Sequence, residues 1–149
     1  MINVGLIGYG YWGPNLARNF QKNRDMNLKT ICDSSPDRLK AAGDLYPGVG
    51  LLNSVEDLIN DKDIDAIAIA TPVSAHFDLA KKILISGKHV WIEKPMTETS
   101  EQAMELIDLA EKNKKVIIVD HTFIYTGAVR KIKEVINSIL SRAGMPTPT

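Results

Sequence analysis

The chain has 149 residues, the size of a single domain, and its 18 acidic side chains balance its 18 basic ones. This zero net charge gives no support for a nucleic-acid or anionic-membrane partner, and we expect neither. The only cysteine is Cys32, so no intrachain disulfide can form, and its apolar neighbours favour a buried structural thiol. Without an apolar run of about 18 residues or a signal-peptide pattern, a cytoplasmic protein is expected.

Short apolar runs alternate with amphipathic stretches along the whole chain. Such runs are typical of buried strands, whereas apolar residues spaced three and four apart indicate helices. Residues 64–70 are almost continuously apolar, which is typical of a strand covered on both faces of its sheet. We predict strands over residues 2–7, 27–33, 51–52, 64–70, 88–92 and 116–119.

Capping residues mark where helices begin. Ser35 followed by Pro36, and Thr99 three residues before Gln102, are both helix N-terminal signatures. A further helix is expected over residues 73–86. The inward-facing stripes are predicted to be Trp12, Leu16 and Phe20; Leu39, Ala42, Leu45 and Tyr46; Val55, Leu58 and Ile59; Ala80, Ile83 and Leu84; and Ala103, Leu106, Ile107 and Ala110.

This alternation of strands and helices predicts an α/β domain with a parallel sheet covered on both faces. Right-handed crossovers then favour a doubly wound Rossmann fold with about six strands. We assign residues 1–123 to this domain and expect residues 124–140 to form an amphipathic helix whose apolar stripe needs a partner surface. Residues 141–149, with their prolines and threonines, are expected to be a disordered tail.

The turn after the first strand reads Gly8-Tyr9-Gly10-Tyr11-Trp12-Gly13 and matches G-x-G-x-x-G. Glycines reach this spacing by chance, but a position between a strand and a helix favours a dinucleotide site over a ligand-free turn. Gly8 would allow the tight turn, Gly10 the approach of a pyrophosphate, and Gly13 close packing of helix on sheet. Free N–H groups and the positive end of the helix dipole would attract the phosphates.

Asp33 lies twenty residues after Gly13, at the expected end of the second strand. A carboxylate there accepts hydrogen bonds from the adenosine ribose and repels a 2′-phosphate, which favours NAD over NADP as the cofactor. Arg38 could instead meet a phosphate, although its place on the following helix fits a solvated position better.

Polar groups follow three further strands, at the edge where open parallel sheets bind ligands. These groups are Thr71-Pro72, Glu93-Lys94-Pro95 and Asp120-His121. Lys94 is the catalytic candidate, because an ammonium group beside a substrate hydroxyl can polarise it or relay a proton during hydride transfer. The alternative for Lys94 alone is an ordinary solvent-exposed lysine at a strand end.

The histidines leave several interpretations open. His76 lies in the first turn of its helix, where packing or capping is as good an interpretation as ligand contact. His121 is ambiguous and stays among the cofactor-binding candidates because it ends the sixth strand. The histidines and acids show no metal-ligand spacing, so no metal is predicted.

Together with the glycine turn, three segments carry a resemblance to a known family: Cys-Asp-Ser-Ser-Pro-Asp-Arg at 32–38, Thr-Pro-Val-Ser-Ala-His at 71–76 and Glu-Lys-Pro at 93–95. In this order they resemble the Gfo/Idh/MocA oxidoreductases, which include glucose–fructose oxidoreductase and inositol 2-dehydrogenase. The resemblance covers residues 1 to about 140, and residues 119–125 more loosely resemble the nucleotide-sugar dehydrogenase branch.

The resemblance implies more than the motifs show by themselves. It implies a cis peptide at Lys94–Pro95 and Lys94 as the group that reaches the oxygen of the reacting carbon. The implied cofactor contacts are the backbone of Tyr11 and Trp12 near the pyrophosphate, Thr71, Pro72 and His76 along the far side of the dinucleotide, and Glu93 and Lys94 beside the nicotinamide ribose.

Members of the family are much longer, with a second domain that supplies the substrate pocket. We therefore expect the NAD-binding part of a dehydrogenase that moves a hydride between a sugar or polyol carbon, nucleotide sugars included, and nicotinamide. Its C-terminal substrate domain would be missing, and turnover alone would be small. The alternative is a stand-alone dinucleotide sensor that dimerises through helix 124–140. A third interpretation is that a separate chain supplies the substrate domain.

Overall fold

A computed structural model describes residues 1–146, so the last three residues of the expected tail lie outside the described residues. Within residues 1–146, six strands follow one another with helices between them, in the order that the apolar runs predicted. The strands are β1 (Ile2–Ile7), β2 (Met26–Cys32), β3 (Gly50–Leu52), β4 (Ala66–Ile69), β5 (His89–Glu93) and β6 (Ile117–Asp120).

Both predicted caps form as expected. The Ser35 hydroxyl accepts a hydrogen bond from the Arg38 N–H at 3.4 Å, and the Thr99 hydroxyl accepts one from the Gln102 N–H at 3.3 Å. Single 3-10 turns, η1 (Val73–Ala75) and η2 (Thr122–Tyr125), precede two of the helices. The helices are α1 (Gly13–Lys22), α2 (Pro36–Leu45), α3 (Val55–Asn60), α4 (His76–Ile85), α5 (Ser100–Asn113) and α6 (Gly127–Arg142).

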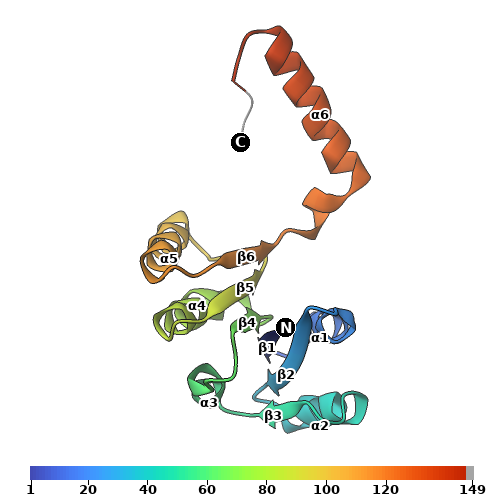
Figure 1. The fold of residues 1–149 in the computed structure, drawn as a ribbon, viewed down its shortest axis with the longest axis vertical. Coiled ribbons are helices and arrows are strands. Elements are labelled where there is room, and N and C mark those ends of the chain that lie inside the picture. The colour runs from blue at the N-terminus through green and yellow to red at the C-terminus, as the bar shows by residue number, and fades with distance from the viewer. Residues whose placement is uncertain (147–149) are drawn as a thin grey trace.

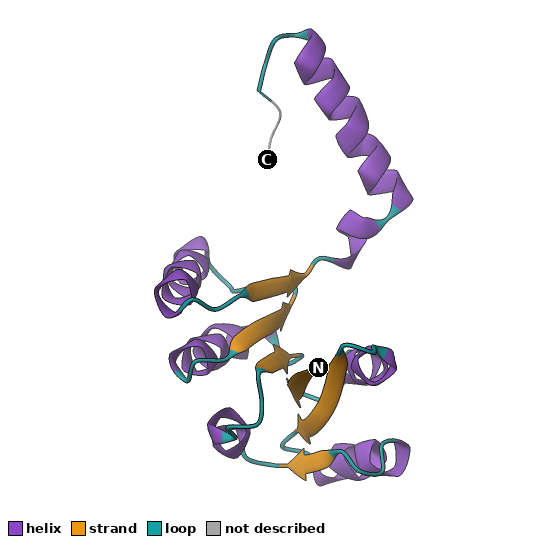
Figure 2. Ribbon diagram, viewed as in Figure 1, coloured by secondary structure: helices purple, strands orange, loops and turns teal. Residues whose placement is uncertain are grey.

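The strands form one sheet in the order β3-β2-β1-β4-β5-β6, and every neighbouring pair is parallel. Helices α1 and α2 cover one face of this sheet, and α3, α4 and α5 cover the other, as Figures 1 and 2 show. The doubly wound Rossmann fold predicted from the sequence is confirmed. Its strand order reverses between β1 and β4, the point where such sheets bind ligands.

The core consists of two layers, one on each face of the sheet. Val4 and Leu6 of β1 pack with Leu16 and Phe20 of α1, whereas Ile7 packs with the layer beneath α3, α4 and α5. This split follows from the strand period of two, which sends successive side chains to opposite faces. The central strand is therefore fixed from both sides, and its C-terminal end, where the glycine turn begins, is held in place.

Some residues of the predicted inner stripes do not face the core. Leu45 is 66% exposed and Ile107 is 41% exposed, because α2 and α5 lie over the two ends of the sheet and bury narrower stripes than expected. Trp12 precedes α1 as its N-cap residue and is 37% exposed, so only Leu16 and Phe20 of its stripe are buried. Strand β4 is also shorter than predicted, since Ile64 precedes it.

Helix α6 projects away from the sheet (Figure 1), and no residue of it is buried. The expected tail was placed to begin at Ser141, but the helix continues to Arg142. Within residues 1–146 no helix combines the length and apolarity needed to cross a membrane. In the same residues, no three side chains of His, Cys, Asp or Glu gather closely enough to hold a metal ion.

Candidate functional site

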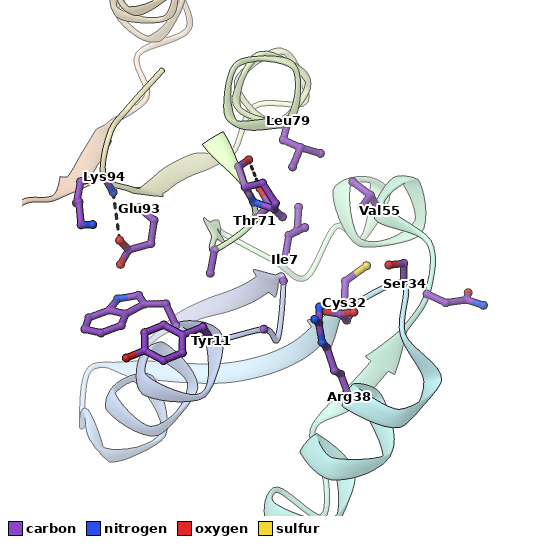
Figure 3. A pocket seen from close by; sticks show the side chains of 17 residues that line it. Ile7, Tyr11, Cys32, Ser34, Arg38, Val55, Thr71, Leu79, Glu93 and Lys94 are labelled. Carbon is purple, nitrogen blue, oxygen red and sulfur yellow. Dashed lines mark hydrogen bonds and ion pairs between the residues drawn. The ribbon is translucent and has the colours of Figure 1, made fainter. Parts of the chain in front are cut away.

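A cleft of about 520 Å³ opens above the C-terminal ends of β1 and β4, a volume in the range of small-molecule and cofactor pockets. The glycine turn, the loop after β2 and the ends of β4 and β5 line it (Figure 3). The segments that follow β1 and β4 turn away from each other toward opposite faces of the sheet, which leaves a space between them above the strand ends.

Packing within the protein requires glycine at two of the three glycine positions of the turn. Gly8 has φ +94°, and a Cβ there would lie 2.6 Å from the carbonyl oxygen of Ala70. A Cβ at Gly13 would collide with the carbonyl group of Gly8. At Gly10, by contrast, the nearest atom to a Cβ would be Nη1 of Arg38 at 3.6 Å, an ordinary contact. Protein packing therefore does not require glycine at position 10, and its missing side chain instead leaves the backbone open to a ligand.

Asp33 holds two loops of the cleft together. Its side chain is only 4% exposed. The Tyr9 N–H donates to Oδ2 of Asp33 at 2.6 Å, and the Ser35 N–H donates to Oδ1 at 2.8 Å. An ionised carboxylate has about four acceptor positions, so these two bonds leave capacity for ribose hydroxyls. Sequence reasoning gave Asp33 a ligand role and missed that it also fixes the glycine turn.

Arg38 bends back from α2 over the same carboxylate. Its Nη1 lies 3.6 Å from Oδ2 of Asp33, and its guanidinium group lines the cleft (Figure 3). The side chain is 55% exposed, so the expected contact with solvent is present, but the side chain also forms part of the cleft wall. The sequence alone did not favour that second position.

Aromatic and charged residues form the other end of the cleft. Tyr11 is 94% exposed, and its ring centroid lies 6.4 Å from that of Trp12. Figure 3 shows Tyr11 at the same end of the cleft as Glu93 and Lys94. The Lys94 ammonium has no hydrogen-bond or ion-pair partner in the part of the chain that the structure describes, and it lines the cleft. The Lys94–Pro95 peptide is cis, as the resemblance implied.

Two groups in the cleft have pKa values raised by burial. Burial raises the pKa of the Glu93 carboxyl to about 7, with the neighbouring Asp120 acting in the same direction and Lys94 against it. Burial also raises the pKa of the Cys32 thiol to about 11, with a smaller contribution from the charge of Asp33. Cys32 is therefore a poor thiolate source near neutral pH, which agrees with the structural role predicted for it.

Three predicted site residues do not line the cleft. Gly13 acts through backbone packing, as described above. His76 is 1% exposed, and its ring nitrogens lie 2.9 Å from the carbonyl oxygens of Pro95 and Thr71, so it supports the wall from behind. His121 is exposed at the start of η2. The predicted residues that do line the cleft are Gly8, Gly10, Tyr11, Trp12, Asp33, Thr71, Pro72, Glu93 and Lys94.

The structure adds an apolar part of the wall that sequence reasoning missed. Val55 and Leu79 both line the cleft, and they lie in the first turns of α3 and α4. The available signal was their place in the first turn of the helix that follows a strand, because that turn lies at the ligand-binding edge of the sheet. The apolar spacing in the sequence predicts only an inward-facing position for Val55.

The residues present fit a dinucleotide. An open backbone at Gly10 lies between Asp33 at one end and Glu93 and Lys94 at the other, and all of these residues line one cleft. The positive end of α1 points to the same turn, where it favours phosphate groups. The fold and the cleft together define a dinucleotide-binding domain.

Comparison with known proteins identifies the family to which this domain belongs. Residues 2–121 match the model of the oxidoreductase family with an NAD-binding Rossmann fold, GFO_IDH_MocA. The chain therefore belongs to the Gfo/Idh/MocA oxidoreductase family, and it is the NAD(P)-binding domain of such an oxidoreductase.

Individual relatives are similar over most of this chain. The uncharacterized oxidoreductase YdgJ of Escherichia coli is 42% identical over 121 residues, which are 80% of this chain and 34% of that protein. A glycosyl hydrolase family 109 protein of Shewanella amazonensis is 31% identical over 74% of this chain and 26% of its own length. The crystal structure of Synechocystis biliverdin reductase with biliverdin and NADP+ matches with a TM-score of 0.83 at 30% identity, over 91% of this chain and 43% of that chain. The chain thus spans about a third of the length of the curated relatives it matches first.

Proposed function

We propose that the cleft binds NAD, with the adenosine half over Asp33 and the nicotinamide half beside Glu93 and Lys94. The observation that carries this proposal is Gly10, where an open backbone lies between these two ends without any packing reason for a glycine. The glycine turn would hold the pyrophosphate through its N–H groups, with the Tyr11 and Trp12 backbone beside it. Thr71 and Pro72 would line the far side, with His76 behind them.

The proposed preference for NAD over NADP rests on charge. The Asp33 carboxylate is buried and accepts two backbone hydrogen bonds, and its negative charge would repel a 2′-phosphate beside it. Within residues 1–146, Arg38 is the only basic side chain that forms an ion pair with Asp33, with its Nη1 at 3.6 Å from Oδ2, and its positive charge opposes this preference. The similar biliverdin reductase has NADP+ in its crystal structure, so the experiment compares the affinities of this chain for NAD and for NADP.

The proposed reaction is hydride transfer between nicotinamide and a CH–OH carbon of a sugar or polyol. The coenzyme would supply the hydride or accept it. Lys94 has a free ammonium group at the nicotinamide end, and it would polarise the substrate oxygen or exchange a proton with it. The family resemblance and the relative in a glycosyl hydrolase family support a carbohydrate substrate.

We assign the coenzyme-binding unit to residues 1–123 and propose that helix 124–140 leads toward a substrate domain in a longer enzyme. The enzyme's substrate pocket and a second catalytic group would come from that domain. This chain by itself would bind the coenzyme and turn over little substrate.

Calorimetric titration with NAD and with NADP tests the proposal. The native chain should bind NAD more tightly, and Asp33→Ser should lower NAD affinity about tenfold or more while narrowing the gap to NADP. Asp37→Ser is the matched control, because Asp37 is exposed in the first turn of α2 and does not line the cleft. A folded native chain that binds neither coenzyme at millimolar concentration would overturn the proposal.

A second candidate function is a dinucleotide sensor that dimerises through α6. The observation that favours it is the apolar stripe of this helix, where Ile132 is 57% exposed and Ile139 is 59% exposed. Sedimentation separates the two functions: the sensor requires a dimer, and a monomer at all concentrations would exclude it.

A further inference from the structure

Two buried carboxyl groups lie side by side at the nicotinamide end of the proposed site. Glu93 ends β5 and Asp120 ends β6, and the two residues are partners in the parallel register of these strands. Each residue is only 8% exposed. Ion pairing does not explain this burial, because no Lys, Arg or His forms a salt bridge with either carboxylate within residues 1–146.

The hydrogen-bond partners of Glu93 favour a proton shared between the Glu93 and Asp120 carboxyl groups. The Lys94 N–H donates to Oε2 of Glu93 at 3.2 Å, but Oε1 is buried and has no donor in the described part of the chain. Two ionised carboxylates only accept hydrogen bonds, so they can bond to each other only when one of them is protonated. A shared proton satisfies both groups and removes one of two like charges from a poorly solvated place.

The charges around the pair leave its protonation sensitive to pH near neutrality. Burial raises the pKa of the Glu93 carboxyl to about 7, with the neighbouring Asp120 acting in the same direction. The Lys94 N–H and ammonium group oppose this rise. The titratable groups that line this end of the cleft with Glu93 are Lys94, which follows β5, and Tyr11 of the glycine turn. Asp120 at the end of β6 and His121 directly after it lie outside the lining, and Asp33 and Arg38 line the opposite end.

We propose that Glu93 and Asp120 share one proton and that, when this proton leaves to solvent, the added negative charge makes the domain favour oxidised over reduced coenzyme. The proposal rests on the function proposed above, which places the nicotinamide beside Glu93. The physical reason is that the nicotinamide ring carries a positive charge in NAD+ and none in NADH. A second negative charge at this end therefore stabilises the oxidised form selectively. Asp120 does not line the cleft and acts through Glu93, as a positioning residue.

The experiment measures the affinities of NAD+, NADH and ADP-ribose by calorimetry between pH 5.5 and 8.5. The ratio of NAD+ to NADH affinity in the native chain should rise on the order of tenfold across this range, as expected for one charge acting through a partly solvated site. ADP-ribose lacks the nicotinamide and should show no such rise.

Variants test whether the Glu93–Asp120 pair causes the pH dependence of the ratio of NAD+ to NADH affinity. Asp120→Asn and Glu93→Gln each leave one carboxylate, so the affinity ratio should stay near its low-pH value at every pH. Asp108→Asn makes the same chemical change on the exposed side of α5 and should keep the native profile. A flat ratio in the native chain, or an unchanged rise in Asp120→Asn, would overturn the proposal while the proposed function stands.

The coenzyme-free chain gives a second readout. Carbon-13 NMR of the glutamate carboxyl groups should show Glu93 titrating well above ordinary glutamates, and Asp120→Asn should lower its midpoint. An ordinary midpoint in the native chain would overturn the shared proton whatever the coenzyme does. If all three ligands fail to bind, the proposed function fails, and the role of the pair toward the coenzyme fails with it.

Discussion

The Rossmann body and helix α6 have similar amphipathic sequences but opposite environments. In the body, α1 buries Leu16, Ala17 and Phe20 against the sheet. In α6 an equally clear stripe, with Ile132, Val135, Ile136 and Ile139, is exposed along its length. The comparison teaches that apolar periodicity predicts that a helix has a face to bury, but not which surface will bury it.

The largest expected difference between the two regions is in stability. Ile92→Ala, at a site of 0% exposure in the sheet, should lower the free energy of unfolding by about 2–5 kcal/mol. Ile132→Ala, at 57% exposure in α6, should change it by less than about 0.5 kcal/mol. Denaturant unfolding of the two variants measures this difference. Equal losses would mean that α6 packs against the body in solution.

Glycine substitutions sharpen the same comparison at the site. Gly13→Ala should reduce coenzyme affinity at least about tenfold, because a Cβ would collide with the Gly8 carbonyl and open the phosphate turn. Gly127→Ala at the start of α6 meets nothing within 4 Å and should leave coenzyme affinity unchanged. Fluorescence titration with NADH measures both variants. A similar loss in both would show that α6 contributes to the site.

The dependence of stability on pH should also belong to the body. Glu93 has its pKa raised from 4.5 to about 7, so between these values the folded chain binds more protons than the unfolded chain. This contribution therefore favours folding at low pH and is lost as the pH rises toward 7. Asp120→Asn should flatten this fall in the free energy of unfolding, whereas Glu134→Gln on α6 should not. A profile altered by the α6 variant alone would contradict this assignment.

The smallest expected effect on stability comes from adding charge to α6. Replacing Ile132 and Ile136 with lysine should leave the free energy of unfolding nearly unchanged, since both residues are exposed. The same change should improve solubility and reduce binding of a hydrophobic dye, because it interrupts the apolar stripe. Lower solubility of the double variant would indicate that this stripe packs on its own domain.

Features coded by neighbouring residues were predicted well from the sequence. The glycine turn between β1 and α1, the caps at Ser35 and Thr99 and the doubly wound alternation of strands and helices all depend on local patterns and general rules of chain connection. The position of the cleft followed because these rules place the turn and the end of β2 at one edge of the sheet.

Features that depend on contacts between distant residues were not predicted. The bond from Tyr9 to Asp33 joins residues 24 apart, and the pairing of Glu93 with Asp120 requires the register of two strands. His76 contacts the carbonyl groups of two separate loops, which placed its ring behind the cleft wall. Side-chain geometry across the sheet, and not residue type, decides these positions.

The hydrogen bond from the Tyr9 amide to Asp33 has a dynamic consequence. It joins the glycine turn to Asp33 at the end of β2, so we expect these two segments of the cleft wall to move together. Amide hydrogen exchange at Tyr9 should therefore be slow, and it should become slower still when a nucleoside binds at the Asp33 end of the cleft. The exchange rate of the Tyr9 amide proton should therefore indicate whether the cleft holds a ligand.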